Sequence, residues 1–380
     1  MQLTETQIQI RDTARRFAQT ELAPHVMQWD RDGGTPREVL RALGRVGLMG
    51  VCADPEYGGA GADFVAYALA IEEISAADGG ISNYMAANNS PVAAAIDQAG
   101  TDHQKREYLT RLCSGEWLGS IHLTEPHTGS DAAAIRTRAE RDGEDWIING
   151  HKAFITAGRS SDVAIIVAVT DPSAGKRGIT TFVTPTDNPG YQVIREEVKL
   201  GHRTNDTCQV VFDNMRVPNR DVLGEPGRGL GIALGHLSAG RIGVAAQATG
   251  GARAALRAAR AYAQQRETFG QTIINHQAIG FMLADMATQI EAARQLYLHA
   301  ASLKSRGEPC AKEASMAKLF ASEMAERVAS NAIQIHGGAG FLNDFEVEKI
   351  YRDVRVYQIY EGTSEVQKLV ISRMIDDFDL

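Results

Sequence analysis

One carboxylate near the C-terminus stands in a setting that suits proton transfer. Glu361 lies within residues 357–365, YQIYEGTSE, between aromatic and small residues and just before a helix that Thr363 or Ser364 could cap. Apolar surroundings raise the pKa of a carboxyl group toward neutrality, which is what a general base needs when it takes a proton from carbon. Spacing alone leaves a second interpretation about equally open, in which Glu361 merely precedes a capped helix.

Two other segments carry groups that could hold a ligand. Residues 119–131, GSIHLTEPHTGSD, are rich in hydroxyls and turn formers, so their backbone N–H groups and side-chain oxygens could meet a polar heterocycle or a phosphate. Residues 334–341, QIHGGAGF, form a helix end that runs into glycines, where backbone could approach a pyrophosphate. Composition alone favours simpler interpretations, a domain-crossing turn for the first segment and a helix C-cap for the second.

The elements that must position these segments fall into three blocks, which predict a multi-domain α+β protein. Residues 1–117 are predicted to be a helical domain, which opens on a helix capped by Thr4 with Gln7 three residues later. Residues 118–230 are predicted to be a middle antiparallel β domain, and residues 231–380 a C-terminal helical bundle.

These blocks are defined by changes in the spacing of apolar residues, from a period of about 3.6 residues to a period of 2 and back. In the middle block a hairpin is predicted around Asn149-Gly150, the dipeptide typical of two-residue turns. Further predicted strands and the long Ala-rich helices that follow them are 162–170, 179–185, 191–198 and 208–212, then 243–264, 278–303 and 310–336. Such long apolar helix faces need a partner surface, so we expect an oligomer.

Composition excludes several classes of protein. The 380 residues are 44% apolar and 23% charged, as in folded globular proteins. The longest strongly apolar run, residues 163–169, is far shorter than the roughly 18 residues of a membrane span, and the first fifteen residues lack the hydrophobic core of a secretory signal. Four cysteines without metal-ligand spacing suit a reducing compartment. We therefore expect a cytoplasmic protein with no membrane insertion.

Charge and motifs exclude further functions. The net charge is −8, and no segment is basic enough to suit binding of nucleic acid. No GxGxxG follows a strand, which disfavours a nicotinamide cofactor, and no GxSxG or Cys–His signature suggests covalent hydrolysis. His122 and His127 flank Pro126 at a spacing that suits neither a helix face nor HExxH, so no metal site is predicted.

Together, the three segments resemble one family, the acyl-CoA dehydrogenases, over nearly the whole chain. LTEPxxGSD (123–131) is similar to that family's first flavin-binding signature, QIHGGAGF (334–341) to its second, and QIYEGTSEVQ (358–367) to the segment with its catalytic glutamate. Residues 237–252 and 266–286 agree as well. The resemblance implies an N-terminal helical domain, a middle β domain and a C-terminal four-helix bundle, with FAD bound between domains and across a subunit boundary of a homotetramer.

The resemblance also implies roles for particular residues. Glu361 would be the catalytic base. The residues that would bind FAD are Ile121, Leu123, Thr124, Gly129, Ser130, Phe154, Ile155, Thr156, Arg266, Gln277, Gln334, Ile335, His336, Gly337, Gly338, Thr363, Ser364 and Glu365. Those that would contact the substrate are Ser130, Ser238, Ala239, Gly240, Arg241 and Gly362.

The implied reaction is α,β-dehydrogenation of an acyl-CoA thioester to the trans-2-enoyl-CoA. Glu361 would remove a proton from Cα while flavin N5 accepts a hydride from Cβ, and electrons would pass to an electron-transfer flavoprotein. The Glu361 backbone N–H and a ribityl hydroxyl would stabilise the thioester oxygen. Some family members carry the base on the helix that contains Gly240, where a glycine cannot serve.

Some positions depart from the family pattern, and two other functions remain open. His127, Thr128, Phe154 and Ser238 differ from the residues commonest in the family. The sequence is most similar to short-chain and branched-chain members, with Met85 and Asn89 as candidates for the acyl pocket. The alternatives are an acyl-CoA oxidase or other flavin oxidase on the same fold, and a catalytically silent acyl-CoA-binding scaffold.

Overall fold

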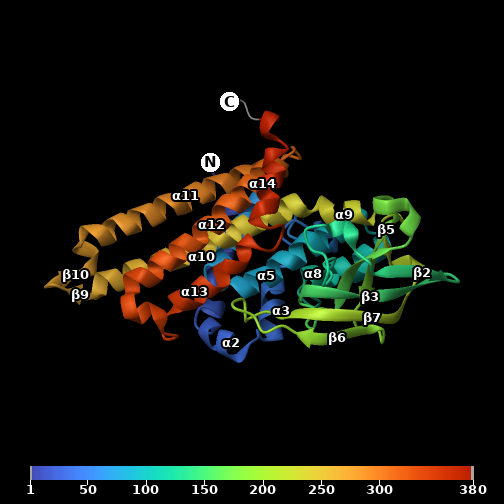
Figure 1. Ribbon diagram of the computed structural model, residues 1–380, viewed down its shortest axis with the longest axis horizontal. Coiled ribbons are helices and arrows are strands. Elements are labelled where there is room, and N and C mark those ends of the chain that lie inside the picture. Colours follow the sequence, from blue (N-terminus) through green and yellow to red (C-terminus); the bar gives the residue numbers. More distant parts are fainter. Residues whose placement is uncertain (1, 378–380) are drawn as a thin grey trace.

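The computed structural model describes residues 2–377 and shows helices, then a sheet, then helices along the chain (Figure 1). The predicted fold class is confirmed. The sheet lies at one end of the molecule, and three long helices extend from it to the opposite end (Figure 1). No helix among residues 2–377 is both long enough and apolar enough to cross a membrane.

The two longest N-terminal helices, α1 and α4, pack against each other, and α4 also packs on the long C-terminal helices. Helix α1 begins after Thr4, whose side chain accepts from Gln7 N at 3.3 Å while Thr4 N donates to Gln7 Oε1 at 2.9 Å, so the predicted capping box is confirmed. The helices are α1 (Glu5–Phe17), α2 (Val26–Asp32), α3 (Arg37–Arg45), α4 (Phe64–Ser75), α5 (Gly79–Ala87), α6 (Ala94–Ala99), α7 (Asp102–Gln104) and α8 (Thr110–Cys113).

The middle sheet has eight strands, in the order β6-β7-β3-β2-β4-β5-β8 with β1 paired to β4. Most neighbours are antiparallel, as predicted for this domain, but β1 and β2 both run parallel to β4. The strands are β1 (Gly119–His122), β2 (Arg138–Asp142), β3 (Asp145–Thr156), β4 (Val163–Val169), β5 (Ile179–Pro185), β6 (Tyr191–Glu196), β7 (Thr207–Val217) and β8 (Val222–Leu223).

The prediction of a hairpin around Asn149-Gly150 was wrong. Both residues lie inside β3, at a register shift against β7, and the turn between β2 and β3 is instead Gly143-Glu144. A Cβ on Gly150 would lie 2.3 Å from Thr137 Oγ1, so this glycine permits close approach of a neighbouring side chain. An Asn-Gly dipeptide looks the same in the sequence whether its glycine permits a close contact or forms a turn.

The C-terminal helices form a bundle, as predicted. Helix α10 packs against α12, α11 and α4, and its buried positions are largely alanine and glycine, which allow close packing. The helices and small strands are α9 (Gly229–Gly235), α10 (Leu237–Gln265), β9 (Glu267–Thr268), β10 (Gln271–Thr272), α11 (Gln277–Ser305), α12 (Ala311–His336), α13 (Glu346–Val354) and α14 (Ser364–Ser372).

A buried group of charges joins the three parts of the chain. Lys349 of α13 donates to Asp78 Oδ2 at the start of α5 and to Asp353 Oδ2, both at 2.6 Å. Asp353 also accepts from the backbone N of His202, in the loop between β6 and β7, at 2.6 Å. The His202 ring contacts the rings of Tyr357 and Tyr360. These contacts tie all three parts to the segment that carries Glu361.

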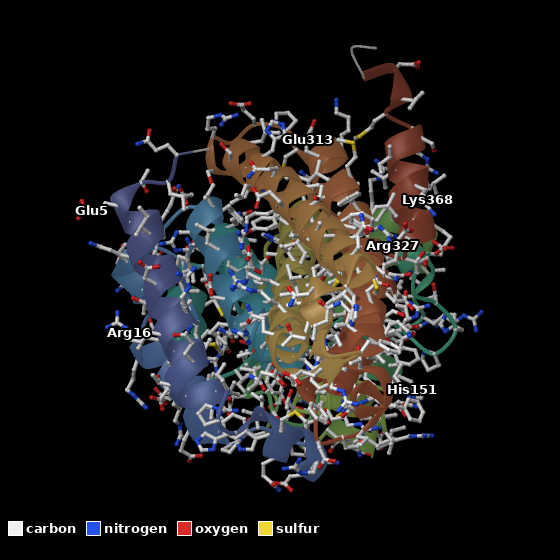
Figure 2. The ribbon with its side chains drawn as sticks, turned by 90° about the vertical axis from the view of Figure 1, so that its left-hand side faces the viewer. Glu5, Arg16, His151, Glu313, Arg327 and Lys368 are labelled. Carbon is white, nitrogen blue, oxygen red and sulfur yellow. The ribbon has the colours of Figure 1, made fainter. Side chains whose placement is uncertain are left out.

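Replacing Lys349 with methionine should destabilise the protein, because two buried carboxylates would lose their cation. Removal of one partner from a buried ion pair costs about 3–5 kcal/mol. We expect the urea midpoint of Lys349→Met to fall clearly. Lys368→Met is the matched control, because Lys368 is 60% exposed and lies at the periphery (Figure 2). Equal midpoints for the two variants would contradict a structural role for the junction.

Candidate active site

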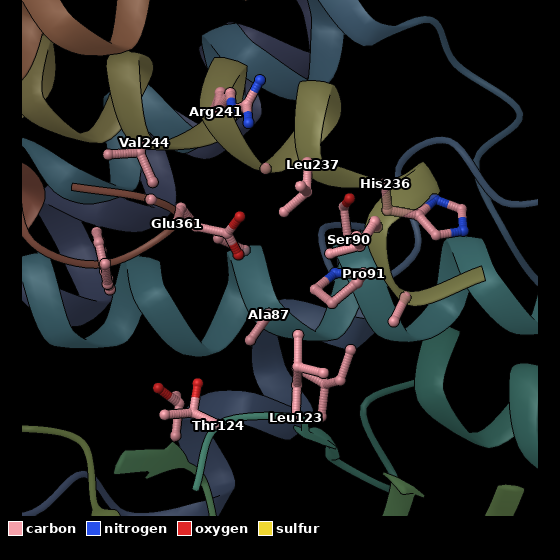
Figure 3. Close-up of a pocket in the computed structure, with 18 of the residues that line it drawn as sticks. Ala87, Ser90, Pro91, Leu123, Thr124, His236, Leu237, Arg241, Val244 and Glu361 are labelled. Atoms are coloured by element: carbon pink, nitrogen blue, oxygen red, sulfur yellow. The ribbon is translucent and has the colours of Figure 1, made fainter. Parts of the chain in front are cut away.

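A cavity of about 280 Å³ lies where the three parts of the chain meet. Its walls come from α4 and α5, from the loop after β1, from the end of β3, from α10 and from residues 360–366. Figure 3 shows the Glu361 carboxylate pointing into the space between α10 and α5, with Leu123 and Thr124 on the opposite side of α5 from Arg241. The residue proposed as a base from sequence therefore lies in a cavity.

Local backbone geometry directs Glu361 into this cavity. Glu361 has φ = 53° and Gly362 has φ = 88°, so two consecutive residues adopt the left-handed conformation. A non-glycine residue rarely adopts it, and such strain is typical of functional sites. Thr363 then caps α14, because its Oγ1 accepts from Val366 N at 3.3 Å. The left-handed turn thus leads directly into α14, whose cap holds it on one side.

Helix α10 leaves room for the carboxylate at Gly240. A Cβ built on Gly240 would lie 2.6 Å from Glu361 Oε2 and 2.9 Å from Cδ, closer than real Cβ contacts. Any side chain at position 240 would therefore displace the carboxyl group. Glycine at this position lets the Glu361 carboxyl group lie against α10.

The surroundings of Glu361 suit a proton acceptor. Burial raises the pKa of Glu361 above its ordinary value, while Arg241 and Lys318 act in the opposite direction. A carboxylate whose pKa is raised by burial is a stronger proton acceptor than a surface carboxylate. The site therefore supports the general-base interpretation over the simple helix-start interpretation.

A second buried carboxylate fixes the loop after β1. Glu125 is 3% exposed and accepts from Lys152 Nζ of β3 at 2.9 Å and from the backbone N of Arg136 and Thr137. Lys152 also donates to the carbonyl of Leu123. Burial opposes ionisation of Glu125, but the Lys152 charge and the hydrogen bonds from Lys152, Arg136 and Thr137 together lower the pKa of Glu125. The loop is thus held against β3 with its neighbours facing the cavity.

The end of β3 completes this wall. Phe154 has φ = 58° and is 67% exposed, beside a register shift between β3 and β7. The shift breaks the ladder and turns the strand at the cavity, as bulges near binding sites do. Thr156 Oγ1 accepts from Asn83 Nδ2 of α5 at 3.4 Å. An exposed aromatic ring therefore stands at the cavity, where a flat ligand could cover it.

The structure brings one set of predicted residues together and places another elsewhere. Those that line the cavity are Ile121, Leu123, Thr124, Gly129, Ser130, Phe154, Ile155, Thr156, Gly240, Arg241, Glu361 and Gly362. Adjacent to it, but outside its lining, are Ser238 and Ala239 at the start of α10 and Thr363, Ser364 and Glu365 at the start of α14.

The other predicted residues lie at the far ends of the long helices. Arg266 follows α10 at the small β9–β10 hairpin, Gln277 begins α11, and residues 334–338 span the end of α12 (Figure 1). The rings of Tyr262 and His336 stack at 4.4 Å, so the ends of α10 and α12 lie together. Within one chain, the predicted cofactor residues therefore form two separate groups.

Sequence reasoning missed several residues of the cavity and misplaced two. Asn89 hydrogen-bonds inward to Leu48 O, Met85 O and Val51 N, and Met85 is fully buried in the core, so neither lines the cavity. The missed lining residues include Tyr67, Asn83, Ser90, His236, Gln247 and Tyr360. Tyr360, next to the predicted base, is the one that its position could have indicated. Among residues 2–377 no group of three or more acidic, histidine or cysteine side chains could hold a metal ion.

Fold and site together define a protein in which a glutamate faces a cavity between the helices and the eight-stranded sheet. Family models match in the same order, with the acyl-CoA dehydrogenase N-terminal domain at residues 4–116, the middle domain at 120–215 and the C-terminal domain at 227–375. The chain belongs to the acyl-CoA dehydrogenase family, as its motifs indicated.

Relatives agree over the full length. An acyl-CoA dehydrogenase of Bacillus subtilis is 44% identical over 375 residues, covering 99% of each chain. Butyryl-CoA dehydrogenase from Megasphaera elsdenii has a similar structure, with a TM-score of 0.96, 40% identity and 99% coverage of each chain. A chain in the structure described as the electron transferring flavoprotein of Acidaminococcus fermentans gives a TM-score of 0.97, 43% identity and the same coverage.

The variant Gly240→Ala tests whether the Glu361 carboxyl group must pack against a glycine of α10. The added methyl group should push the carboxyl group of Glu361 out of place, and a displacement of about 1 Å can cost on the order of 10²-fold in rate. We expect dehydrogenation to fall by that order while the protein stays folded. Gly231→Ala is the control, since a Cβ there meets no atom within 4 Å. Full activity in Gly240→Ala would contradict the placement of Glu361.

Proposed function

We propose that this chain oxidises short acyl-CoA thioesters to trans-2-enoyl-CoA thioesters, with Glu361 as the base that removes the Cα proton. The observation that carries the proposal is the desolvated Glu361 carboxylate, directed into a cavity by a left-handed turn and packed on Gly240. The relative from Megasphaera elsdenii is described as a butyryl-CoA dehydrogenase, which supports a short acyl chain.

The cavity fits FAD as the cofactor. The hydroxyls of Thr124, Ser130 and Thr156 line it, the exposed Phe154 ring stands beside it, and the buried Oγ of Ser364 has no partner in the described residues. When bound, FAD supplies the two-electron acceptor for the hydride that leaves Cβ. In our proposal Leu123, Thr124 and Ser130 contact the isoalloxazine and ribityl parts, and Phe154 to Thr156 cover the ring.

The backbone at Glu361 suits stabilisation of the thioester oxygen. Loss of the Cα proton builds negative charge on that oxygen, so a donor must be aimed at it. Among residues 2–377 no carbonyl or side chain accepts a hydrogen bond from the Glu361 N–H. We propose that this N–H donates to the thioester oxygen, which places base and oxyanion donor on one residue.

The interior of the cavity limits the acyl chain. Tyr360 OH donates to Gln247 Oε1 at 2.8 Å, and Gln247 Nε2 donates to Ser82 Oγ at 2.9 Å, so Gln247 is fixed in the wall and fully buried. Tyr67 of α4 also lines the cavity with a buried hydroxyl. Because Tyr360 and Gln247 are held in place by these bonds, a long acyl chain could enter only by displacing fixed side chains of the wall. A panel of acyl-CoAs of increasing length should therefore give its highest kcat/KM with short chains.

In an oligomer, the two groups of predicted cofactor residues would come from neighbouring subunits and meet at one FAD. We propose that Arg266, Gln277 and residues 334–338 reach the diphosphate and adenosine of FAD held in a neighbouring subunit of a homotetramer. Their position at the far helix ends, away from the chain's own cavity, supports this arrangement. The electron acceptor in the proposal is an electron-transfer flavoprotein, and the similarity to a chain from the Acidaminococcus fermentans structure supports it.

Glu361→Gln tests the base. The amide keeps the shape and the backbone N–H but cannot accept a proton, so turnover should fall by at least about 10⁴-fold, the upper end for general bases. In anaerobic mixing with butyryl-CoA, wild type should bleach the oxidised flavin band, and the variant should show only a spectral shift from bound ligand. Rapid bleaching by the variant would exclude Glu361 as the base. Loss of folding or flavin would favour a structural role.

The same mixing experiment separates the two alternative functions. A catalytically silent scaffold would bind acyl-CoA without bleaching, and a purified protein without colour would favour it. A flavin oxidase would bleach and then regain its colour rapidly in air. Slow recovery in air together with rapid recovery on addition of an electron-transfer flavoprotein is the outcome expected for a dehydrogenase.

Arg266→Ala tests the shared cofactor site. A guanidinium offers charge-assisted hydrogen bonds to a diphosphate, each worth roughly 1.5–3 kcal/mol, so the variant should lose FAD more readily than wild type. Flavin content after gel filtration measures this, with Arg306→Ala as a surface control whose partner is Glu308. Unchanged flavin with weaker substrate binding would place Arg266 in the substrate site instead.

A further inference from the structure

Lys318 is a buried lysine without a carboxylate partner. It lies on α12 with its side chain fully buried, and its Nζ donates to the carbonyl of Gly362 at 2.7 Å. Within residues 2–377 no carboxylate lies within ion-pair distance of this ammonium group. The other two lysines buried to a similar degree differ, since Lys152 pairs with Glu125 and Lys349 with Asp78 and Asp353. An ammonium group rarely stays buried without such a partner, so this position calls for a specific reason.

The acceptor of Lys318 belongs to the turn that presents the base. Gly362 follows Glu361, and both residues are left-handed. Gln367 of α14 donates to the same carbonyl at 2.8 Å and to Glu361 O at 3.2 Å. Two side chains from different helices therefore hold the carbonyls of the strained turn. One is neutral and one carries a charge, so the two contributions can be separated by substitution.

The charge of Lys318 acts on Glu361 together with that of Arg241. The titratable groups that face Glu361 are Arg241 of α10, Lys318 of α12, Tyr67 of α4 and the adjacent Tyr360. Arg241 Nη1 donates to Ser315 Oγ, one turn before Lys318 on α12, and its Nε is buried without a partner. Glu365 and Glu323 also act on Lys318, as weaker and more distant charges. Two buried cations thus flank one carboxylate.

We propose that Lys318 is a positioning residue for the base: it holds the Glu361–Gly362 turn through the Gly362 carbonyl, and its charge favours the carboxylate form of Glu361 against the effect of burial. This inference rests on the proposed function of Glu361. It assigns two separable effects to one side chain, a geometric effect on the turn and an electrostatic effect on the carboxylate. No motif in the sequence assigns either effect to this residue.

Stability should respond to Lys318 in the opposite direction from activity. Burial lowers the pKa of Lys318 to about 8, with Glu361 acting against that change. Because this folded-state pKa lies below that of an unfolded lysine, the charged side chain destabilises the fold below about pH 8, and the penalty disappears as the pH rises through that of the unfolded lysine. Lys318→Met should therefore fold with FAD and be at least as stable as wild type at pH 7, with the difference shrinking toward pH 10.

The test uses three holoenzyme variants and butyryl-CoA under anaerobic conditions. Lys318→Met removes both the hydrogen bond and the charge, Lys318→Gln replaces the ammonium with a neutral donor, and Gln367→Met removes only the neutral donor. The rate of flavin bleaching is measured against pH, with Lys368→Gln as the surface control. Wild type must bleach first, because failure at that step concerns the proposed function and not Lys318.

Each variant has its own expected pH profile. Without the Lys318 charge the pKa of Glu361 rises, so the acid limb of the rate profile should move to higher pH in both Lys318 variants. Gln367→Met should lower the rate without moving the limb. At pH values above the limb, Lys318→Met should be slower on the order of 10²-fold through misplacement of the base, and Lys318→Gln should retain more of the rate.

A measurement independent of turnover follows Glu361 itself. Infrared titration detects its protonated carboxyl band, which is assigned by its absence in Glu361→Gln. In the Lys318 variants this band should persist to higher pH than in wild type. An acid limb and a carboxyl band that both stay in place in Lys318→Gln would overturn the electrostatic part of the proposal. Loss of stability and flavin in step with activity in Lys318→Met would overturn the positioning role in favour of a structural one.

Discussion

A single carboxylate withdrawn from water is the constraint around which this protein is arranged. Glu361 must be desolvated enough to be basic and yet remain charged, and these needs conflict because burial favours the neutral acid. Arg241 and Lys318 act against the effect of burial on the pKa of Glu361, and α10 leaves room for the carboxyl group because it has no side chain at Gly240. The left-handed backbone at Glu361 is a further cost that this placement imposes.

The three parts of the chain contribute to this arrangement through buried charges. Lys349 with Asp78 and Asp353 joins helices from both ends of the chain beneath the segment that carries the base. Glu125 with Lys152 fixes the loop on the opposite wall. Such pairs add little net stability compared with apolar packing, but removal of one partner destabilises the protein strongly. Their value here lies in fixing the relative positions of elements whose own packing could tolerate small shifts.

Much of the fold and of the chemical centre could be predicted from the sequence because those features are local. A change of the hydrophobic period from 3.6 to 2 residues and back marks the sheet, and the aromatic and small residues around Glu361 single out this carboxylate, which the structure places in the cavity. Non-local features escaped prediction. The glycine of Asn149-Gly150 serves a contact with Thr137 rather than a turn, and the parallel pairing of β1 with β4 leaves no mark on either strand. Lys318 looks like an ordinary polar position of an Ala-rich helix, because its acceptor lies 44 residues away.

The central claim is that Glu361 takes a proton from Cα while a hydride leaves Cβ. The most direct test is the rate of anaerobic flavin bleaching with butyryl-CoA deuterated at Cα or at Cβ. If the two bonds break in the same step, each label should slow bleaching, and the doubly labelled substrate should be slower than either. An effect of the Cβ label alone, with none from Cα, would show that removal of the Cα proton is not part of the rate-limiting chemistry, and would contradict the account.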